Sequence, residues 1–409
     1  MDQPLPLDPK AEPHAAAARL RAAGAVVRVE LPGGVLAWAV TKQQAARQVL
    51  ADPLFVKELS AWGAWRRGEV PPDWPLLPLV AVANMTTATG ADHTRLRTLV
   101  ARAFTPARVA RLRPRIEAVT AELLDALDGQ RPDTPVDLRA RFALPLPVRV
   151  ICELFGVPAE TDGHNGLGAR IRAGCAELFG TAQTPEQAHT AHLRIRGALG
   201  ELADLRRDHP GDDLTSALVT AHADHDRLSR AELVDTLLLM LVAGHETTVN
   251  LVTNAVLALL THPDQLALVQ AGRIGWETVV EETLRWDAPV ANLPFRYATA
   301  DTVVAGQPIA AGEAVLLCYL ALGRDSGQHG PAAARFDLTR PATAHLSFGH
   351  GPHFCLGAAL ARAEAGIALS ALFARFPDLT LVGPPVEPVD SLLFNARPVL
   401  PVLLELLTE

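Results

Sequence analysis

The sequence is poor in cysteine, in lysine and in aromatic side chains. Its 409 residues include four cysteines, scattered without a paired spacing. This pattern argues against a disulfide framework and favours a reducing compartment, which we expect to be the cytoplasm. The formal net charge of −8 removes any general electrostatic case for nucleic-acid binding.

Long apolar runs are also missing. No run of about eighteen apolar residues occurs, and the nearest candidate, Leu237–Leu260, is interrupted by His245, Glu246, Asn250 and Asn254. The first residues combine prolines, acids and arginines, which is not the pattern of a signal peptide. We therefore expect a soluble protein with no membrane anchor.

What the chain does contain favours helix. Hydrophobic residues make up 49 %, dominated by alanine and leucine, which is enough for a large core. A β-hairpin is expected over residues 25–40, with Leu31–Gly34 as its turn, followed by a helix over residues 42–51. Short strands are expected at residues 303–304 and 314–319, and residues 115–208 read as amphipathic helices.

One cysteine occupies a distinctive setting. The loop Phe348–Gly357 presents Cys355 just ahead of Ala358–Ala365, a run with strong helix propensity. Free N–H groups and the helix dipole at such a terminus favour an anion, so we expect a lowered pKa for the Cys355 thiol. Glycines in the loop allow a flat ligand to approach the sulfur: Gly349, Gly351 and Gly357.

A thiolate in this position suits a nucleophile, a zinc ligand or an axial ligand of haem iron, and a buried structural cysteine is the plainer alternative. Zinc is disfavoured because no second cysteine lies nearby. A cysteine hydrolase is disfavoured because nothing in the loop identifies a general base.

The loop as a whole resembles the haem-ligand loop of the cytochrome P-450 family, with every fixed position filled: Phe348, Gly349, Gly351, His353, Cys355 and Gly357. The resemblance implies that Cys355 is the axial ligand of haem b, and that Phe348, Gly349, His353 and Gly357 contact the cofactor. It further implies a mainly α fold with small β-sheets (α+β), a long central helix over the haem, and one domain over residues 1–409 with a β-rich part at about residues 20–60.

A second segment breaks local helix rules. Ser229 and Glu232 form a capping-box signature that opens a helical pattern running to Thr261. In its middle, Gly244 is costly for a helix, and the Thr247 hydroxyl can bond back to the carbonyl of Ala243. The plain alternative is a kink with a packing purpose only.

The same segment resembles the oxygen-binding groove of the family. By that resemblance Ala243 and Gly244 leave room for O2, and Thr247 and Glu246 are the catalytic residues that deliver protons. His245 is expected to be structural.

Further positions match the family one by one. His93 and Arg97 share a helix face, and with Arg296 they would hold the haem propionates. Glu282 and Arg285 match the core signature that supports the haem fold, and Arg335 would complete that network.

Substrate contacts are implied only by family position. They are mostly apolar: Met85, Val242, Ala243, Val290, Leu293 and Phe394. Residues 60–90, rich in tryptophan and proline, are expected to form a lid over this pocket, with a well-packed surface loop as the alternative.

Seven arginines and no acid lie between His93 and Ile116. Such a run is usually a solvated face, but in the resembled fold it lies on the cysteine side of the haem. We therefore expect a docking surface for an acidic electron donor.

Together these features predict a haem-thiolate monooxygenase acting on a bulky, largely hydrophobic small molecule of steroid, terpenoid or polyketide type. It would use O2 and electrons from NAD(P)H through a ferredoxin and its reductase. Two alternatives stay open: oxidative aryl or phenol coupling on the same scaffold, and a non-enzymatic haem-binding protein. The sequence ranks neither the substrates nor the oligomeric states.

Overall fold

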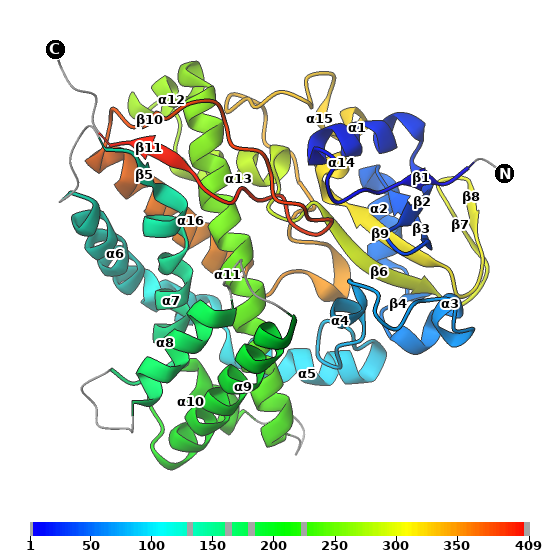
Figure 1. Cartoon of the computed structure of the whole chain (residues 1–409), viewed down its shortest axis with the longest axis horizontal. Helices are drawn as coiled ribbons and strands as arrows, with labels where there is room; N and C mark the ends of the chain where they lie inside the picture. Colours follow the sequence, from blue (N-terminus) through cyan, green and yellow to red (C-terminus); the bar gives the residue numbers. More distant parts are fainter. Residues whose placement is uncertain (1–2, 129–133, 160–165, 179–184, 222–226, 405–409) are drawn as a thin grey trace.

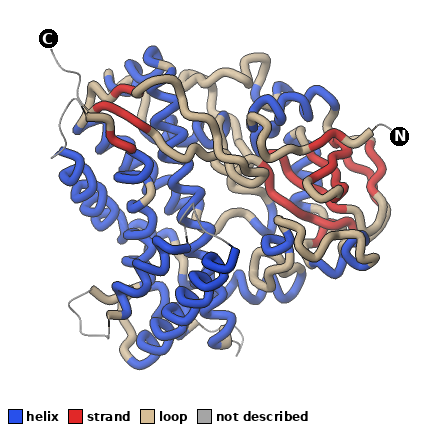
Figure 2. Tube along the Cα trace, viewed as in Figure 1, coloured by secondary structure: helices blue, strands red, loops and turns tan. Residues whose placement is uncertain are grey.

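The computed structural model describes residues 3–128, 134–159, 166–178, 185–221 and 227–404. Helices fill one side of the molecule and the main β-sheet lies on the other (Figure 1). Figure 2 shows that long loops join the two parts. This is the expected α+β class with small sheets.

The main sheet has six strands in the order β1-β2-β3-β9-β6-β4. Their bounds are β1 Leu5–Pro6, β2 Val26–Leu31, β3 Val35–Val40, β4 Phe55–Val56, β6 Asn292–Ala298 and β9 Ala314–Cys318. The predicted hairpin is confirmed as β2 and β3, and Gly33 and Gly34 supply the positive φ angles of its turn. Two smaller sheets contain β7 Thr302–Val304 with β8 Gln307–Ile309, and β5 Val136–Asp137, β10 Thr380–Leu381 and β11 Pro401–Leu403.

A single long helix, α11 (Arg230–Thr261), runs through the helical part (Figure 1). Its predicted capping box is present: the Ser229 hydroxyl accepts from the Glu232 N–H, and the Glu232 carboxylate accepts from the Ser229 N–H. α11 has the length and composition of a membrane span, but most of that stretch is buried inside the molecule. It is therefore the core helix of the helical part.

The remaining helices surround α11 or cover the sheet. Those of the N-terminal half are α1 Pro13–Ala23, α2 Gln43–Ala51, α3 Gly63–Arg66, α4 Leu77–Val80, α5 Gly90–Ala103, α6 Pro106–Asp128, α7 Pro145–Phe155, α8 Leu167–Leu178, α9 Pro185–Asp208 and α10 Leu214–Thr220. Those after α11 are α12 Pro263–Gln270, α13 Trp276–Trp286, α14 Tyr319–Gly323, α15 Ser326–His329 and α16 Ala358–Arg375.

Residues 60–90 divide into two parts. Trp62 and Trp74 are almost fully buried, and they pack against Phe295 and Tyr297 of β6. The Trp74 indole also donates to the carbonyl of Pro32, at 2.9 Å. The first part is therefore a packed loop, and the exposed apolar side chains that a lid would need begin beyond Trp74, at Leu79 and Val82.

Candidate active site

The cysteine loop is a tight turn closed by its own backbone. The N–H of Cys355 donates to the carbonyl of Phe348 at 2.8 Å, and the N–H of Phe354 donates to Gly351 at 3.0 Å. Gly351 has a φ of 71°, and a Cβ there would lie 2.7 Å from the carbonyl oxygen of Leu50 in α2. Only glycine fits this contact, which fixes the loop against the sheet side of the molecule.

Cys355 lies where the sequence predicts, two residues before the first turn of α16. Its thiol accepts hydrogen bonds from the N–H groups of Gly357 and Ala358, and Arg97 and Arg362 act on it electrostatically. The expected lowering of the pKa is wrong for the protein without a ligand, because burial outweighs these effects and raises the pKa of Cys355. The side chain is accessible, yet protein surrounds it on most sides. A positively charged partner is what would make the thiolate the stable form.

Basic side chains from three parts of the chain meet beside this cysteine. The rings of His93 (α5) and His353 are 4.0 Å apart, and Arg97 donates to the carbonyl of Phe354 at 2.6 Å. Arg296 of β6 is buried and acts electrostatically on both histidines. The structure thus brings together all three side chains predicted to hold propionates, and adds His353.

This cluster has no counter-ion. Within the described parts of the chain, no carboxylate forms an ion pair with Arg97 or Arg296, and the Nε2 atom of buried His93 has no hydrogen-bond partner. Burial first and neighbouring cations second lower the pKa of His93, and that of His353 to about 2. Buried cations without anions are costly, so the cluster fits a ligand that carries carboxylates.

The middle of α11 opens to solvent. Most of this helix is buried, but Val242 is 44 % exposed and Ala243 is exposed beside it. The Thr247 hydroxyl donates to the Ala243 carbonyl at 2.8 Å, which confirms the predicted bond. A Cβ at Gly244 would lie 3.2 Å from Ile151 of α7, so this glycine allows close packing of α7 on α11. Its expected part in leaving room for O2 stays a prediction.

Glu246 and its neighbour differ in their surroundings. Arg139, in a π-helical turn (Arg139–Ala143) before α7, donates to the Glu246 carboxylate at 2.7 Å. His245 is fully buried, and its Nε2 lies 3.1 Å from the carbonyl of Leu144. Burial lowers the pKa of His245 to about 4, so the ring is neutral and donates this bond. Its contacts fit a structural role.

The Glu282–Arg285 pair lies deep in the protein, at 2.6 Å, on α13. Arg285 also donates to the backbone carbonyls of Gly323, Ala333 and Arg335. The sequence assignment of Arg335 needs correction, because this residue contributes its carbonyl and not its guanidinium. The second arginine beside Glu282 is Arg340, whose Nε lies 3.6 Å from the carboxylate.

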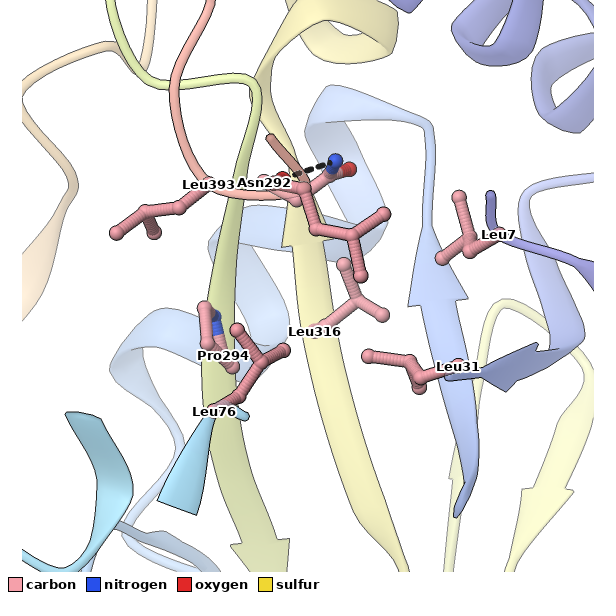
Figure 3. Close-up of a pocket in the computed structure, with 8 residues that line it drawn as sticks. Leu7, Leu31, Leu76, Asn292, Pro294, Leu316 and Leu393 are labelled. Atoms are coloured by element: carbon pink, nitrogen blue, oxygen red, sulfur yellow. Dashed lines mark hydrogen bonds between the residues drawn. The ribbon is translucent and has the colours of Figure 1, made fainter. Parts of the chain in front are cut away.

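Three of the predicted substrate residues come together. Val290 and Phe394 form an isolated β-bridge, so the C-terminal loop lies along the segment leading into β6, where Leu293 is 37 % exposed. Met85 packs with the buried helical core and Val242 is exposed on α11, and their contacts with a substrate stay predictions. Figure 3 shows a separate, small apolar pocket. Its walls include Asn292 and Pro294, which alternate with Leu293 along β6 and so face away from it.

The predicted arginine surface is largely paired. Arg95 bonds to Glu232, Arg113 to Glu117 at 3.2 Å, and Arg115 to Glu153 at 2.8 Å. Arg108 and Arg111 both lie 3.6 Å from Asp212. The run contains no acid in sequence, but Glu117 of the same helix α6 and acids from other parts of the chain pair with its arginines.

Comparison with known proteins now decides the family. The family profile described as Cytochrome P-450 matches residues 175–271 and 276–398. The chain belongs to the cytochrome P-450 family. It is 44 % identical over 387 residues to the 2-hydroxy-5-methyl-1-naphthoate 7-hydroxylase of Streptomyces carzinostaticus, covering 92 % of this chain and 91 % of that protein.

Other relatives agree. The chain is 41 % identical over 371 residues to the vitamin D(3) 25-hydroxylase of Pseudonocardia autotrophica, covering 90 % of this chain and 87 % of that one. The solved structure of CYP154C4 from Streptomyces sp. W2061 superposes with a TM-score of 0.90 at 45 % identity, covering 99 % and 98 % of the two chains. This P-450 is therefore a monooxygenase that uses haem, O2 and a small-molecule substrate.

Proposed function

We propose that this P-450 binds haem b through the Cys355 thiolate and inserts one oxygen atom from O2 into a bulky, mostly hydrophobic small molecule. The observation that supports this most is the pairing of an accessible cysteine at a helix N-terminus with buried basic groups that lack carboxylate partners. A metalloporphyrin with two carboxylates would supply both a metal ion for the thiolate and anions for the basic groups.

Different residues would bind the iron and the carboxylates of the haem. Cys355 holds the iron. Arg97, Arg296, His93 and His353 would bind the two carboxylates. The guanidinium of Arg362 lies 4.5 Å from the ring centroid of Phe348, the first residue of the cysteine loop. The bound haem supplies the oxygen-activating chemistry.

Proton delivery is assigned to Thr247 and Glu246. The Thr247 hydroxyl donates to the Ala243 carbonyl, which leaves its oxygen free to accept a hydrogen bond from another donor. The Glu246 carboxylate is held by Arg139 and has to exchange that partner to carry a proton inward. Arg139 therefore sets how readily the acid moves.

The substrate class follows from the exposed apolar groups and from the relatives. Val242 and Leu293 present hydrophobic surface, and Val290 and Phe394 lie beside Leu293. The named relatives hydroxylate a naphthoate and vitamin D(3), both ring systems of largely hydrophobic character. We infer a steroid, terpenoid or polyketide type of substrate.

Electrons are proposed to come from NAD(P)H through a ferredoxin and its reductase in the cytoplasm. The four cysteines cannot form an iron–sulfur site of their own, because Cys318 ends β9 and Cys355 lies in the loop before α16, while Cys152 and Cys175 are on α7 and α8. We therefore propose that a separate donor protein supplies the electrons.

The deciding experiment is an absorption spectrum. The purified protein reconstituted with haem should give a ferrous carbonyl complex with the spectrum of thiolate ligation, and Cys355→Ser should lose that spectrum and the monooxygenase activity. A colourless protein, or a wild-type spectrum of the histidine-ligated kind, would refute the assignment. A compound screen for the Soret shift that follows loss of the iron-bound water would then identify the substrate class.

A further inference from the structure

The residue directly after strand β4 is Lys57, which belongs to none of the sequence motifs described above. β4 pairs with β6 in antiparallel register, with Val56 opposite Tyr297. One further step in this register brings Lys57 opposite Arg296. Two cations that face each other across strands repel, and such pairs are destabilising unless something lies between them.

Lys57 belongs to the basic cluster beside the cysteine loop. It acts electrostatically on His353, together with His93, Arg97 and Arg296. Its sequence neighbour Glu58 accepts a hydrogen bond from the Thr89 hydroxyl, and that hydroxyl accepts from the Lys57 N–H at 3.1 Å. In the part of the chain that the structure describes, no carboxylate forms an ion pair with the Lys57 ammonium.

The surroundings make this amine easy to deprotonate. Burial first and Arg296 second lower the pKa of Lys57 to about 7. A lysine held in this way regains its full charge when an anion binds nearby. The chain contains only two other lysines, Lys10 and Lys42, and Lys42 is paired with Asp325.

We propose that Lys57 donates its ammonium group to a carboxylate of the bound haem, completing with Arg296 a two-cation site at the end of β4. His93 and Arg97 on α5 would then bind the other carboxylate, so that one carboxylate has donors from the sheet side and the other from a helix. This inference rests on the proposed haem-thiolate function, and it adds a residue from the β-sheet side to the set that holds the cofactor.

Haem retention tests the proposal without measuring turnover. Transfer of haem from the holoenzyme to an excess of apomyoglobin should be about tenfold faster for Lys57→Met than for wild type, since a charge-assisted bond is lost. Lys57→Arg should retain haem nearly as wild type does. Lys10→Met, which removes an exposed lysine, is the matched control and should change nothing.

Amine labelling gives a second readout that needs no variant. Acetic anhydride at neutral pH should modify Lys57 after haem removal and leave it largely unmodified in the holoenzyme, while Lys10 reacts equally in both. Peptide mass spectrometry separates the three lysines.

The outcomes are distinct. Equal haem transfer by Lys57→Met and wild type, or equal labelling of Lys57 with and without haem, overturns the role of Lys57 even if the thiolate spectrum is present. If the wild-type protein takes up no haem, the proposed function fails and this inference fails with it. If Lys57→Met does not fold, labelling of the wild-type protein still decides.

Discussion

Two buried arginines, Arg285 and Arg296, differ in how their charges are compensated. Arg285 has every donor satisfied, by the Glu282 carboxylate and by three backbone carbonyls. Arg296 has only a long contact of 3.5 Å to the carbonyl of Phe55, and no carboxylate partner among the residues described. The charge of Arg285 is compensated within the protein. The charge of Arg296 is compensated only when an anion binds, and this distinguishes a residue that stabilises the fold from one that binds a cofactor.

The largest effect is expected when the Glu282–Arg285 pair is broken. Glu282→Gln leaves the buried Arg285 charge uncompensated, which should lower the free energy of unfolding by about 3–5 kcal/mol. Guanidinium unfolding of the haem-free and haem-loaded proteins should show the loss in both. A loss confined to the haem-loaded form would place Glu282 in the cofactor site instead.

Substitution of Arg296 should lower the stability of the haem-loaded form only. Arg296→Met removes repulsion from the haem-free protein, so the stability of that form should be unchanged or higher. The haem-loaded form should lose about 1.5–3 kcal/mol, the usual worth of a hydrogen bond to a charged group. Thermal unfolding of both forms measures the difference. Equal destabilisation of the two forms would mean that Arg296 is a structural arginine like Arg285.

A similar contrast between a functional and a structural residue is expected on α11, where two threonine hydroxyls each donate to the carbonyl four residues earlier. Thr247 donates to Ala243 at 2.8 Å near the exposed face, and Thr253 donates to Val249 at 3.0 Å in the buried part. Thr247→Val should keep haem and substrate binding while severalfold more of the consumed NADPH appears as peroxide. Thr253→Val is the control and should leave this ratio unchanged. Tight coupling in the Thr247 variant would remove it from proton delivery.

The smallest effect is expected at the arginine surface, because nearby acids already offset much of its charge. Arg102→Glu or Arg113→Glu should slow reduction by a ferredoxin only a few-fold and flatten its dependence on ionic strength. Arg67→Glu, directly after α3, removes an exposed arginine paired with Glu69 and serves as the control. Reduction rates that match wild type at low salt would exclude this surface as the docking site.

Local chemistry explains what could be predicted from the sequence. The capping box of Ser229 and Glu232, the Thr247 bond and the helix after Cys355 all depend on residues within a few positions of one another. The hairpin depends on a two-glycine turn. Such features are readable because the backbone alone brings the groups together.

The errors have the opposite origin. Arg340 reaches Glu282 only through the fold, so sequence reasoning chose Arg335 in its place. The raised pKa of Cys355 reflects burial by distant segments, and the position of Lys57 reflects the register of β4 on β6. No local pattern encodes these contacts.

The close approach of α7 to α11 at Gly244 has a mechanical consequence. A Cβ added at Gly244 would lie 3.2 Å from Ile151, so the two helices pack tightly and leave little room between them for a larger side chain. Leu79 and Val82, by contrast, are exposed apolar side chains on either side of buried Val80, shortly after the packed Trp74. We therefore expect related enzymes with larger substrates to differ more at residues 79–82 than at the contact between α7 and α11.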